Sequence, residues 1–182
     1  MKKMKRFAAV LLGLCLCMLA AACGDQQAAI GADSAAQSSQ QTENSELVGM
    51  ANPWVEAENQ QEAEDQAGYA ITLPQTLPAG YGEPSFLVIP SEIVEAYYAG
   101  TGEARLCVRK AAGTEDASGD YREYPESQQV TVDDLEVTMK GDNGEVSLAV
   151  WQDGTYAYSI GIYGGAGCTV EEMSQMVSEM LE

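Results

Sequence analysis

The segment GDNGEVSLAVWQDGTYAYSIGIY (residues 141–163) holds two tight-turn signals, Asn143-Gly144 and Asp153-Gly154, on either side of one apolar-rich run. Asn-Gly and Asp-Gly favour short hairpin turns because these residues tolerate a positive φ. The segment therefore predicts antiparallel strands joined by tight turns, with one strand at 145–152 between the two signals.

Period-two patterns bounded by proline, glycine and polar residues continue upstream of this segment and predict further strands. They read YAITLP (69–74), PSFLVIP (84–90), EIVEAYYA (92–99) and EARLCVRK (103–110), followed by strands at 128–132 and 135–140. The turn AGTG (99–102) predicts a hairpin between the third and fourth of these segments.

Two short helices are expected beside the strands. Asn59 with Glu62 forms a capping pair for a helix over 60–67 that Gly68 ends. At the other end of the chain, Thr169 with Glu172 forms a capping box. The apolar residues that follow it at helical spacing are Met173, Met176, Val177, Met180 and Leu181.

A single apolar stripe on the last helix predicts that it packs on one face of the sheet. We therefore expect an α+β fold: a mostly antiparallel curved sheet of about six to eight strands, a short N-terminal helix and a C-terminal amphipathic helix packed on the sheet.

The N-terminus resembles a bacterial lipoprotein signal. A basic head with Lys2, Lys3, Lys5 and Arg6 precedes an apolar run over 7–22, which three alanines end before Cys23. Sixteen apolar residues are short for a spanning helix, which needs about 20, and suit a secretion signal. The alternative is an ordinary signal peptide with a chance cysteine.

In a lipoprotein signal the cysteine receives a diacylglyceryl group and becomes the new N-terminus. We therefore expect a signal peptide over 1–22, a lipidated, disordered tether over 23–46 and one ectodomain over 47–182. This organisation predicts a protein anchored through acyl chains such as palmitate at Cys23, on the extracytoplasmic face of the bacterial cell membrane.

The chain is strongly acidic, with nine Lys and Arg against 28 Asp and Glu. Loss of the four cations of the basic head leaves five against 28, a net charge of −23. Such a surface repels phosphate backbones and anionic headgroups. We therefore expect no nucleic-acid partner, and expect the lipid anchor to provide the contact with the membrane.

Short motifs follow one another in order over the ectodomain. They are NPW (52–54), AGY (67–69), RKAAGTEDASGDY (109–121), KG (140–141), W-x-DG-x-Y-x-YSI (151–160) and G-x-T-x-EEM (167–173). As a set they resemble a family of uncharacterised lipoproteins and extracytoplasmic domains of Gram-positive bacteria, a domain of unknown function. A related tail occurs in sensor-like ectodomains attached to anti-sigma factors.

The resemblance covers nearly all of residues 52–182. It implies a cell-surface lipoprotein with a small α+β domain, and a curved open sheet like that of lipoprotein-carrier proteins. It implies no established activity and transfers no functional residue.

The sequence contains no histidine, the commonest general base and a frequent zinc ligand. It also shows no glycine-rich phosphate loop and no spaced cysteine pair outside the signal. A carboxylate pair of the glycosidase type is the remaining catalytic alternative, and the 28 acids single out no such pair. We therefore expect a non-enzymatic protein, with a carboxylate-based hydrolase as the less favoured reading.

The loop with Glu115, Asp116, Ser118 and Asp120 is the candidate metal site. Oxygen side chains at alternate positions occur in calcium loops. No glutamate stands at the twelfth position, where Ser127 lies, so the loop is no EF-hand. The competing and favoured interpretation is that these side chains cap their own backbone turns. Calcium is the only cofactor that the sequence suggests.

Arg105, Cys107 and Arg109 share one face of a predicted strand, with Lys110 beside them. This group is the candidate site for a small anion, and flanking arginines favour a thiolate at Cys107. Pairing of the arginines with acids on neighbouring strands is the favoured alternative.

Cys107 and Cys168 are the two cysteines that follow Cys23. Outside the cell, two such thiols suggest a disulfide, and two free thiols are the alternative.

Six aromatic residues offer a groove for sugar or peptide, with core packing as the favoured alternative. They are Tyr97, Tyr98, Trp151, Tyr156, Tyr158 and Tyr163.

Taken together, these features favour a non-enzymatic surface lipoprotein whose domain binds another envelope protein or a peptide. The alternative is a module that binds calcium or a small anion.

Overall fold

The structure is a computed structural model, and it describes residues 52–181. The expected signal peptide, Cys23 and the expected tether lie outside the described residues. Within the described range, none of the helices combines the length and the apolar character that crossing a membrane requires.

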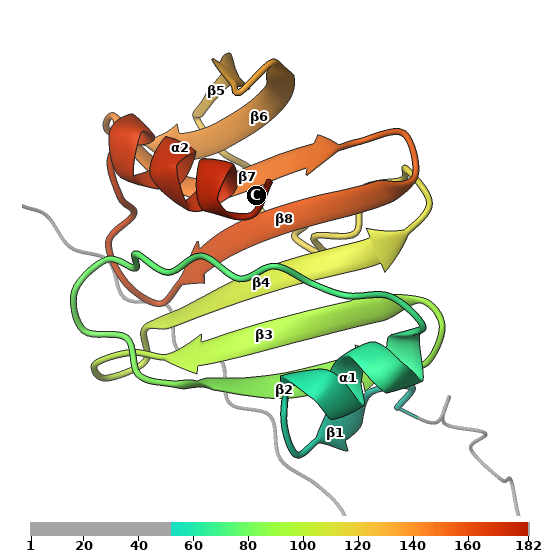
Figure 1. The fold of residues 1–182 in the computed structure, drawn as a ribbon. Coiled ribbons are helices and arrows are strands. Elements are labelled where there is room, and N and C mark those ends of the chain that lie inside the picture. Colours follow the sequence, from blue (N-terminus) through green and yellow to red (C-terminus); the bar gives the residue numbers. More distant parts are fainter. Residues whose placement is uncertain (1–51, 182) are drawn as a thin grey trace, which may run out of the picture. The chain divides into compact units, whose positions relative to one another are not determined.

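Eight strands form one antiparallel sheet in the order β1-β2-β3-β4-β8-β7-β6-β5 (Figure 1). The strands are β1 (Val55–Ala57), β2 (Pro84–Ile89), β3 (Ile93–Ala99), β4 (Arg105–Ala112), β5 (Glu126–Val132), β6 (Leu135–Asp142), β7 (Glu145–Gln152) and β8 (Tyr156–Tyr163). Two four-stranded meanders, β1–β4 and β5–β8, meet where β4 pairs with β8. The expected antiparallel sheet is therefore confirmed.

Residues with a positive φ form the tight turns of the second meander. Asn143 and Gly144 join β6 to β7 with φ values of 53° and 79°, the left-handed geometry that such a turn requires. Gly154, with φ 91°, lies in the turn from β7 to β8. A third tight turn, at Asp133 and Asp134, also has positive φ at both residues and joins β5 to β6.

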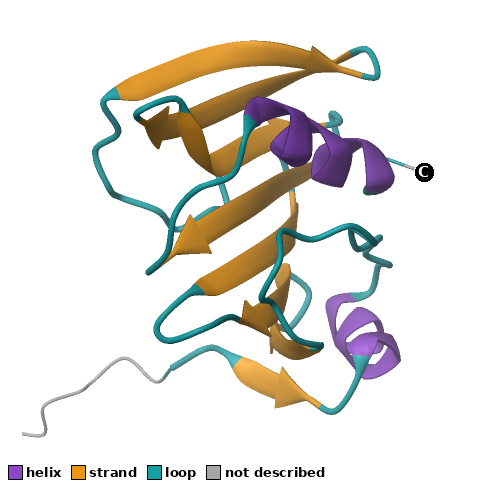
Figure 2. Cartoon of the chain, turned by 90° about the vertical axis from the view of Figure 1, so that its left-hand side faces the viewer, coloured by secondary structure: helices purple, strands orange, loops and turns teal. Residues whose placement is uncertain are grey.

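Both helices lie on the same face of the curved sheet (Figure 2). Helix α1 (Gln60–Ala67) begins at the N-cap Asn59 and ends at Gly68, whose φ is 83°. Helix α2 (Val170–Glu179) begins with the predicted capping box of Thr169 and Glu172. Helix α1 has the predicted boundaries, and α2 has the predicted N-terminal cap. The buried residues of α2 include Met173, Met176 and Val177 of the predicted apolar stripe.

The core lies between the sheet and this helical layer. On the sheet side, core residues occupy alternate positions of each strand. Examples are Val94 and Ala96 of β3, Leu106 and Val108 of β4, and Ile160 of β8. We call this side the helical face and the other side the helix-free face.

Residues 69–74 do not form the predicted strand. The side chains of α1 satisfy the backbone of this segment instead: Ile71 N donates to Glu64 Oε1 at 3.0 Å, and Gln60 Nε2 donates to Ile71 O at 2.7 Å. Because Ile71 is buried and Leu73 packs against the core, the segment covers the sheet without pairing with a strand.

Candidate functional site

One long connection crosses the helix-free face. Strand β4 ends in the middle of the sheet at Ala112, whereas β5 begins at the far edge at Glu126. The intervening residues 113–125, here the crossing loop, therefore have to span the second meander. Arg109 and Tyr163, which point to the helix-free face, both contact this loop or its side chains.

Arg109 holds the middle of the crossing loop. Its Nε donates to Oε2 of Glu95, the residue directly opposite on β3, at 2.5 Å. Its Nη1 donates to the carbonyl oxygens of Ala117 and Ser118. The Trp54 ring lies against the same guanidinium, with its centroid 5.3 Å from Arg109 Cζ. Arg109 is thus a structural anchor, as the strand-pairing interpretation predicted.

Gly119 permits this close approach. Its φ is +62°, and a Cβ there would lie 2.6 Å from Arg109 Nη1. A side chain at this position would therefore push the loop away from the arginine.

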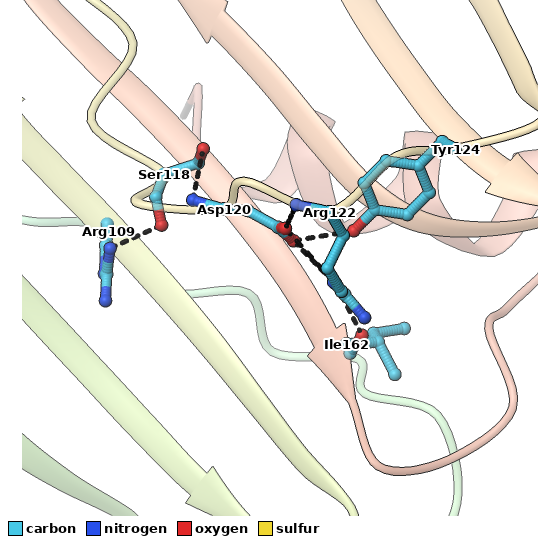
Figure 3. A network of polar contacts seen from close by, with 6 residues as sticks. All are labelled: Arg109, Ser118, Asp120, Arg122, Tyr124 and Ile162. Atoms are coloured by element: carbon cyan, nitrogen blue, oxygen red, sulfur yellow. Dashed lines mark hydrogen bonds and ion pairs between the residues drawn. The ribbon is translucent and has the colours of Figure 1, made fainter.

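A second ion pair holds the end of the crossing loop (Figure 3). Arg122 Nη2 lies 2.6 Å from Asp120 Oδ2, and Tyr124 Oη donates to the same oxygen at 2.6 Å. Arg122 also donates to the carbonyl oxygen of Ile162 on β8. Burial raises the pKa of Asp120, but the hydrogen bonds from Arg122 and Tyr124 outweigh it and bring the pKa to about 2.

The acidic residues of the loop serve its own turns. Asp116 Oδ1 accepts from Ser118 N at 2.8 Å, and Ser118 Oγ accepts from Asp120 N at 3.2 Å. No set of three carboxylate or cysteine side chains within residues 52–181 is placed to hold a metal ion. These contacts match the turn-capping interpretation for Asp116 and Ser118, and Asp120 Oδ1 likewise accepts from Arg122 N at 2.9 Å. A calcium site formed by Glu115, Asp116, Ser118 and Asp120 stays a prediction.

Arg105 is the exposed arginine of β4. It lies 5.2 Å from the ring centroid of Tyr163, and Arg122 lies 4.4 Å from the same ring. No carboxylate of the described chain lies within ion-pair distance of Arg105. Tyr163 in turn folds over Gly161, where a Cβ would come within 2.6 Å of the tyrosine Oη.

A pocket of about 470 Å³ lies beside this stack. Its lining includes Arg105, Tyr97 and the β3–β4 turn with Glu103. We call Arg105, Tyr163, Tyr97 and this pocket the Arg105 site.

Lys110 does not belong to that site, which corrects the grouping expected from the sequence. Strand alternation turns it to the helical face, where its Nζ lies 4.3 Å from the Tyr156 ring and 5.5 Å from those of Tyr69 and Tyr158. Its Nζ also donates to the Ala70 carbonyl at 2.7 Å. Burial lowers the pKa of Lys110, although Asp153 and Glu64 oppose the shift.

Cys107 and Cys168 are free thiols, so the structure does not contain the disulfide that the sequence suggested. Cys107 faces the helix-free side and Cys168 belongs to the core of the helical face. Burial first, and then Glu95, raises the pKa of Cys107 to about 12, and Arg109 and Arg105 offset only part of the shift. The expected thiolate is therefore wrong.

The six aromatic candidates divide between the two faces. Trp151 stacks on Tyr158 at 5.3 Å, and these residues lie with Tyr98 and Tyr156 on the helical face. Tyr97 and Tyr163 lie on the helix-free face. The six residues form no single groove. Core packing accounts for Trp151, Tyr98 and Tyr158, whereas the Tyr156 ring contacts Lys110.

Sequence reasoning missed three residues of the helix-free face: Trp54, Glu95 and Arg122. Glu95 carried a signal, because an acid placed between apolar residues in a central strand needs a partner. Trp54 and Arg122 lie outside any regular pattern, and their contacts depend on the path of the crossing loop.

Comparison with models of known protein families, with curated proteins and with solved structures found no match. The resemblance to the lipoprotein family therefore stays a prediction.

Proposed function

We propose that the chain is a lipid-anchored surface protein whose domain is a non-enzymatic module that binds an envelope protein or peptide. The N-terminal signal pattern and Cys23 support the anchor and the extracytoplasmic location. The absence of histidine from the sequence supports a binding role rather than a catalytic one.

The observation that carries the proposal is the Arg105 site. The chain has 28 acids, yet Arg105 is exposed and, among the described residues, has no carboxylate partner. A guanidinium binds a carboxylate through two parallel hydrogen bonds, and an aromatic ring beneath it keeps it in place. The partner is therefore expected to present a carboxylate to Arg105 and to contact Tyr97 and Tyr163 beside it.

Photo-crosslinking in the native envelope tests this proposal. A photoreactive residue at Glu103, which lines the site, should give an adduct with one envelope protein. The same residue at Glu171, an exposed acid on α2, is the matched control and should give none. Arg105→Gln should abolish the adduct from position 103. Equal adducts from both positions, or an adduct that survives Arg105→Gln, would contradict the proposal.

A small free anion is the alternative occupant of the same guanidinium. Saturable binding of acetate to the lipid-free chain, lost in Arg105→Gln, together with no protein adduct from position 103, would favour this alternative.

The calcium alternative concerns the crossing loop. A thermal melt of the lipid-free chain, in chelator and then in millimolar calcium, tests it because a ligand that binds only the folded state raises the melting temperature. A rise specific to calcium, absent with magnesium and lost in Asp116→Asn, would establish it.

A further inference from the structure

The sheet opens between β6 and β7 near the β5–β6 turn. Their pairing ends at Thr138 and Val150, although β6 begins at Leu135 and β7 continues to Gln152. Each strand remains paired on its other side, β6 with β5 and β7 with β8. Figure 1 shows β6 diverging from β7 toward this end.

A pocket of about 360 Å³ lies at this opening, within the size range of small-molecule sites. We call it the β6–β7 slot; its wall includes Asp116, Glu136, Thr138, Val150, Trp151 and Gln152. The crossing loop contributes Asp116, so the slot lies between that loop and the open part of the sheet.

Trp151 lines the slot, although strand alternation turns its indole toward the helical face, where it stacks on Tyr158. Its Nε1 is the one buried side-chain nitrogen or oxygen in the described part of the chain that has no hydrogen-bond partner. Buried donors are nearly always paired, and an exception calls for a missing water or ligand. Because this nitrogen is buried, a ligand in the slot would not contact it, and Trp151 serves as a nearby reporter of the slot.

The chemistry of the wall restricts the ligand. The slot is lined by two carboxylates and contains no lysine or arginine, so an anion would be repelled. Asp116 and Glu136 accept hydrogen bonds, the Gln152 amide donates them, and the Thr138 hydroxyl does both. The ligand therefore has to donate and accept, and Val150 provides an apolar floor for its less polar face.

We propose that the β6–β7 slot binds one or two units of a neutral saccharide. Sugar hydroxyls both donate and accept hydrogen bonds, and the ring carries no charge. The slot lies at the Ala157 end of β8, and the Arg105 site lies at the Tyr163 end, roughly 20 Å away at about 3.3 Å per residue. The two sites are therefore independent, and either can fail without the other.

Tryptophan fluorescence tests the proposal on the lipid-free chain. The protein has two tryptophans, so Trp54→Phe leaves Trp151 as the single reporter in the slot. A panel of neutral mono- and disaccharides, with and without acetamido groups, is titrated to millimolar concentration. We expect at least one to shift the Trp151 emission saturably.

Variants locate the site. Glu136→Gln should weaken that binding at least tenfold, and Thr138→Val should weaken it as well. Glu123→Gln removes the same charge from an exposed position of the crossing loop outside the slot, and should bind like the parent chain. Glu136→Gln and Glu123→Gln should keep the parent's melting temperature, since both residues are exposed.

Three outcomes would overturn the proposal. They are no saturable signal from any sugar of the panel, equal loss of binding in Glu123→Gln and Glu136→Gln, and saturable binding of tetramethylammonium in place of the sugars. The last outcome would make the slot a site for organic cations.

Discussion

Arg109 and Glu95 face each other across β4 and β3 and form an ion pair under the crossing loop, with Glu95 only 5 % exposed. The pair links the first meander to the loop that leads into the second. The structure thus uses one of its few cations to hold the helix-free face together.

Arg109→Met should destabilise the domain by about 3–5 kcal/mol, because it leaves the Glu95 carboxylate buried and unpaired. Urea unfolding of the lipid-free chain measures this loss. The double variant Glu95→Leu with Arg109→Met should be more stable than Arg109→Met alone. Simple addition of the two single losses would contradict a coupled pair.

Asp120 should make the stability depend on pH in the acid range. Its pKa in the folded state is about 2, below the ordinary value of 3.8, so the folded chain holds this proton less tightly than the unfolded chain. The stabilisation is therefore complete above about pH 5 and is lost as the pH falls through 4 toward 2.

The difference in melting temperature between the parent chain and Asp120→Asn should accordingly be constant from neutral pH to about pH 5 and shrink below about pH 4. Glu115→Gln, an exposed acid of the same loop, is the control. A difference that grows as the pH falls would contradict the role of Arg122 and Tyr124 in holding the ionised carboxylate.

Lys110→Met should cost about 1–3 kcal/mol, since it removes the cation from the rings of Tyr69, Tyr156 and Tyr158 and the hydrogen bond to Ala70. Lys140→Met removes a cation of the helix-free face and should cost less. Chemical denaturation measures the free energy of unfolding of both variants. Equal decreases would mean that the contact of Lys110 with the three tyrosine rings adds no stability.

Both thiols should be free and unreactive in the folded protein. Burial raises the pKa of Cys107 and of Cys168 to about 12, so little thiolate is present at neutral pH. A thiol reagent should label neither residue quickly in the native lipid-free chain and both after unfolding, as mass spectrometry would show. A mass lower by two hydrogen atoms, with no labelling after unfolding, would establish the disulfide instead.

The sequence identified the elements whose structure is local. Capping residues at Asn59 and Thr169 and the turn at Asn143-Gly144 each act within a few neighbours, so the two helices and the second meander follow from them. The alternation in β4 also placed Arg105, Cys107 and Arg109 on one face.

The pairing of β4 with β8 could not be predicted from the sequence. The two strands lie far apart in the chain, and the pattern of either one would suit pairing with any other central strand. The path of the crossing loop depends on that pairing, and so do the contacts of Trp54 and Arg122. The segment 69–74 has a strand pattern, but the side chains of Gln60 and Glu64 form hydrogen bonds with the backbone carbonyl and N–H of Ile71 at its centre.

One pull-down experiment tests the central claim most directly. The lipid-free parent chain, Arg105→Gln and Lys140→Gln are each immobilised, and quantitative mass spectrometry compares the envelope proteins that each retains. Both variants lose one cation, and only Arg105 lies in the proposed site. The account predicts at least one envelope protein that the parent and Lys140→Gln retain and that Arg105→Gln retains at least tenfold less, a difference of about 1.4 kcal/mol or more. If Arg105→Gln retains every such protein as well as the parent does, the Arg105 site is not the binding site.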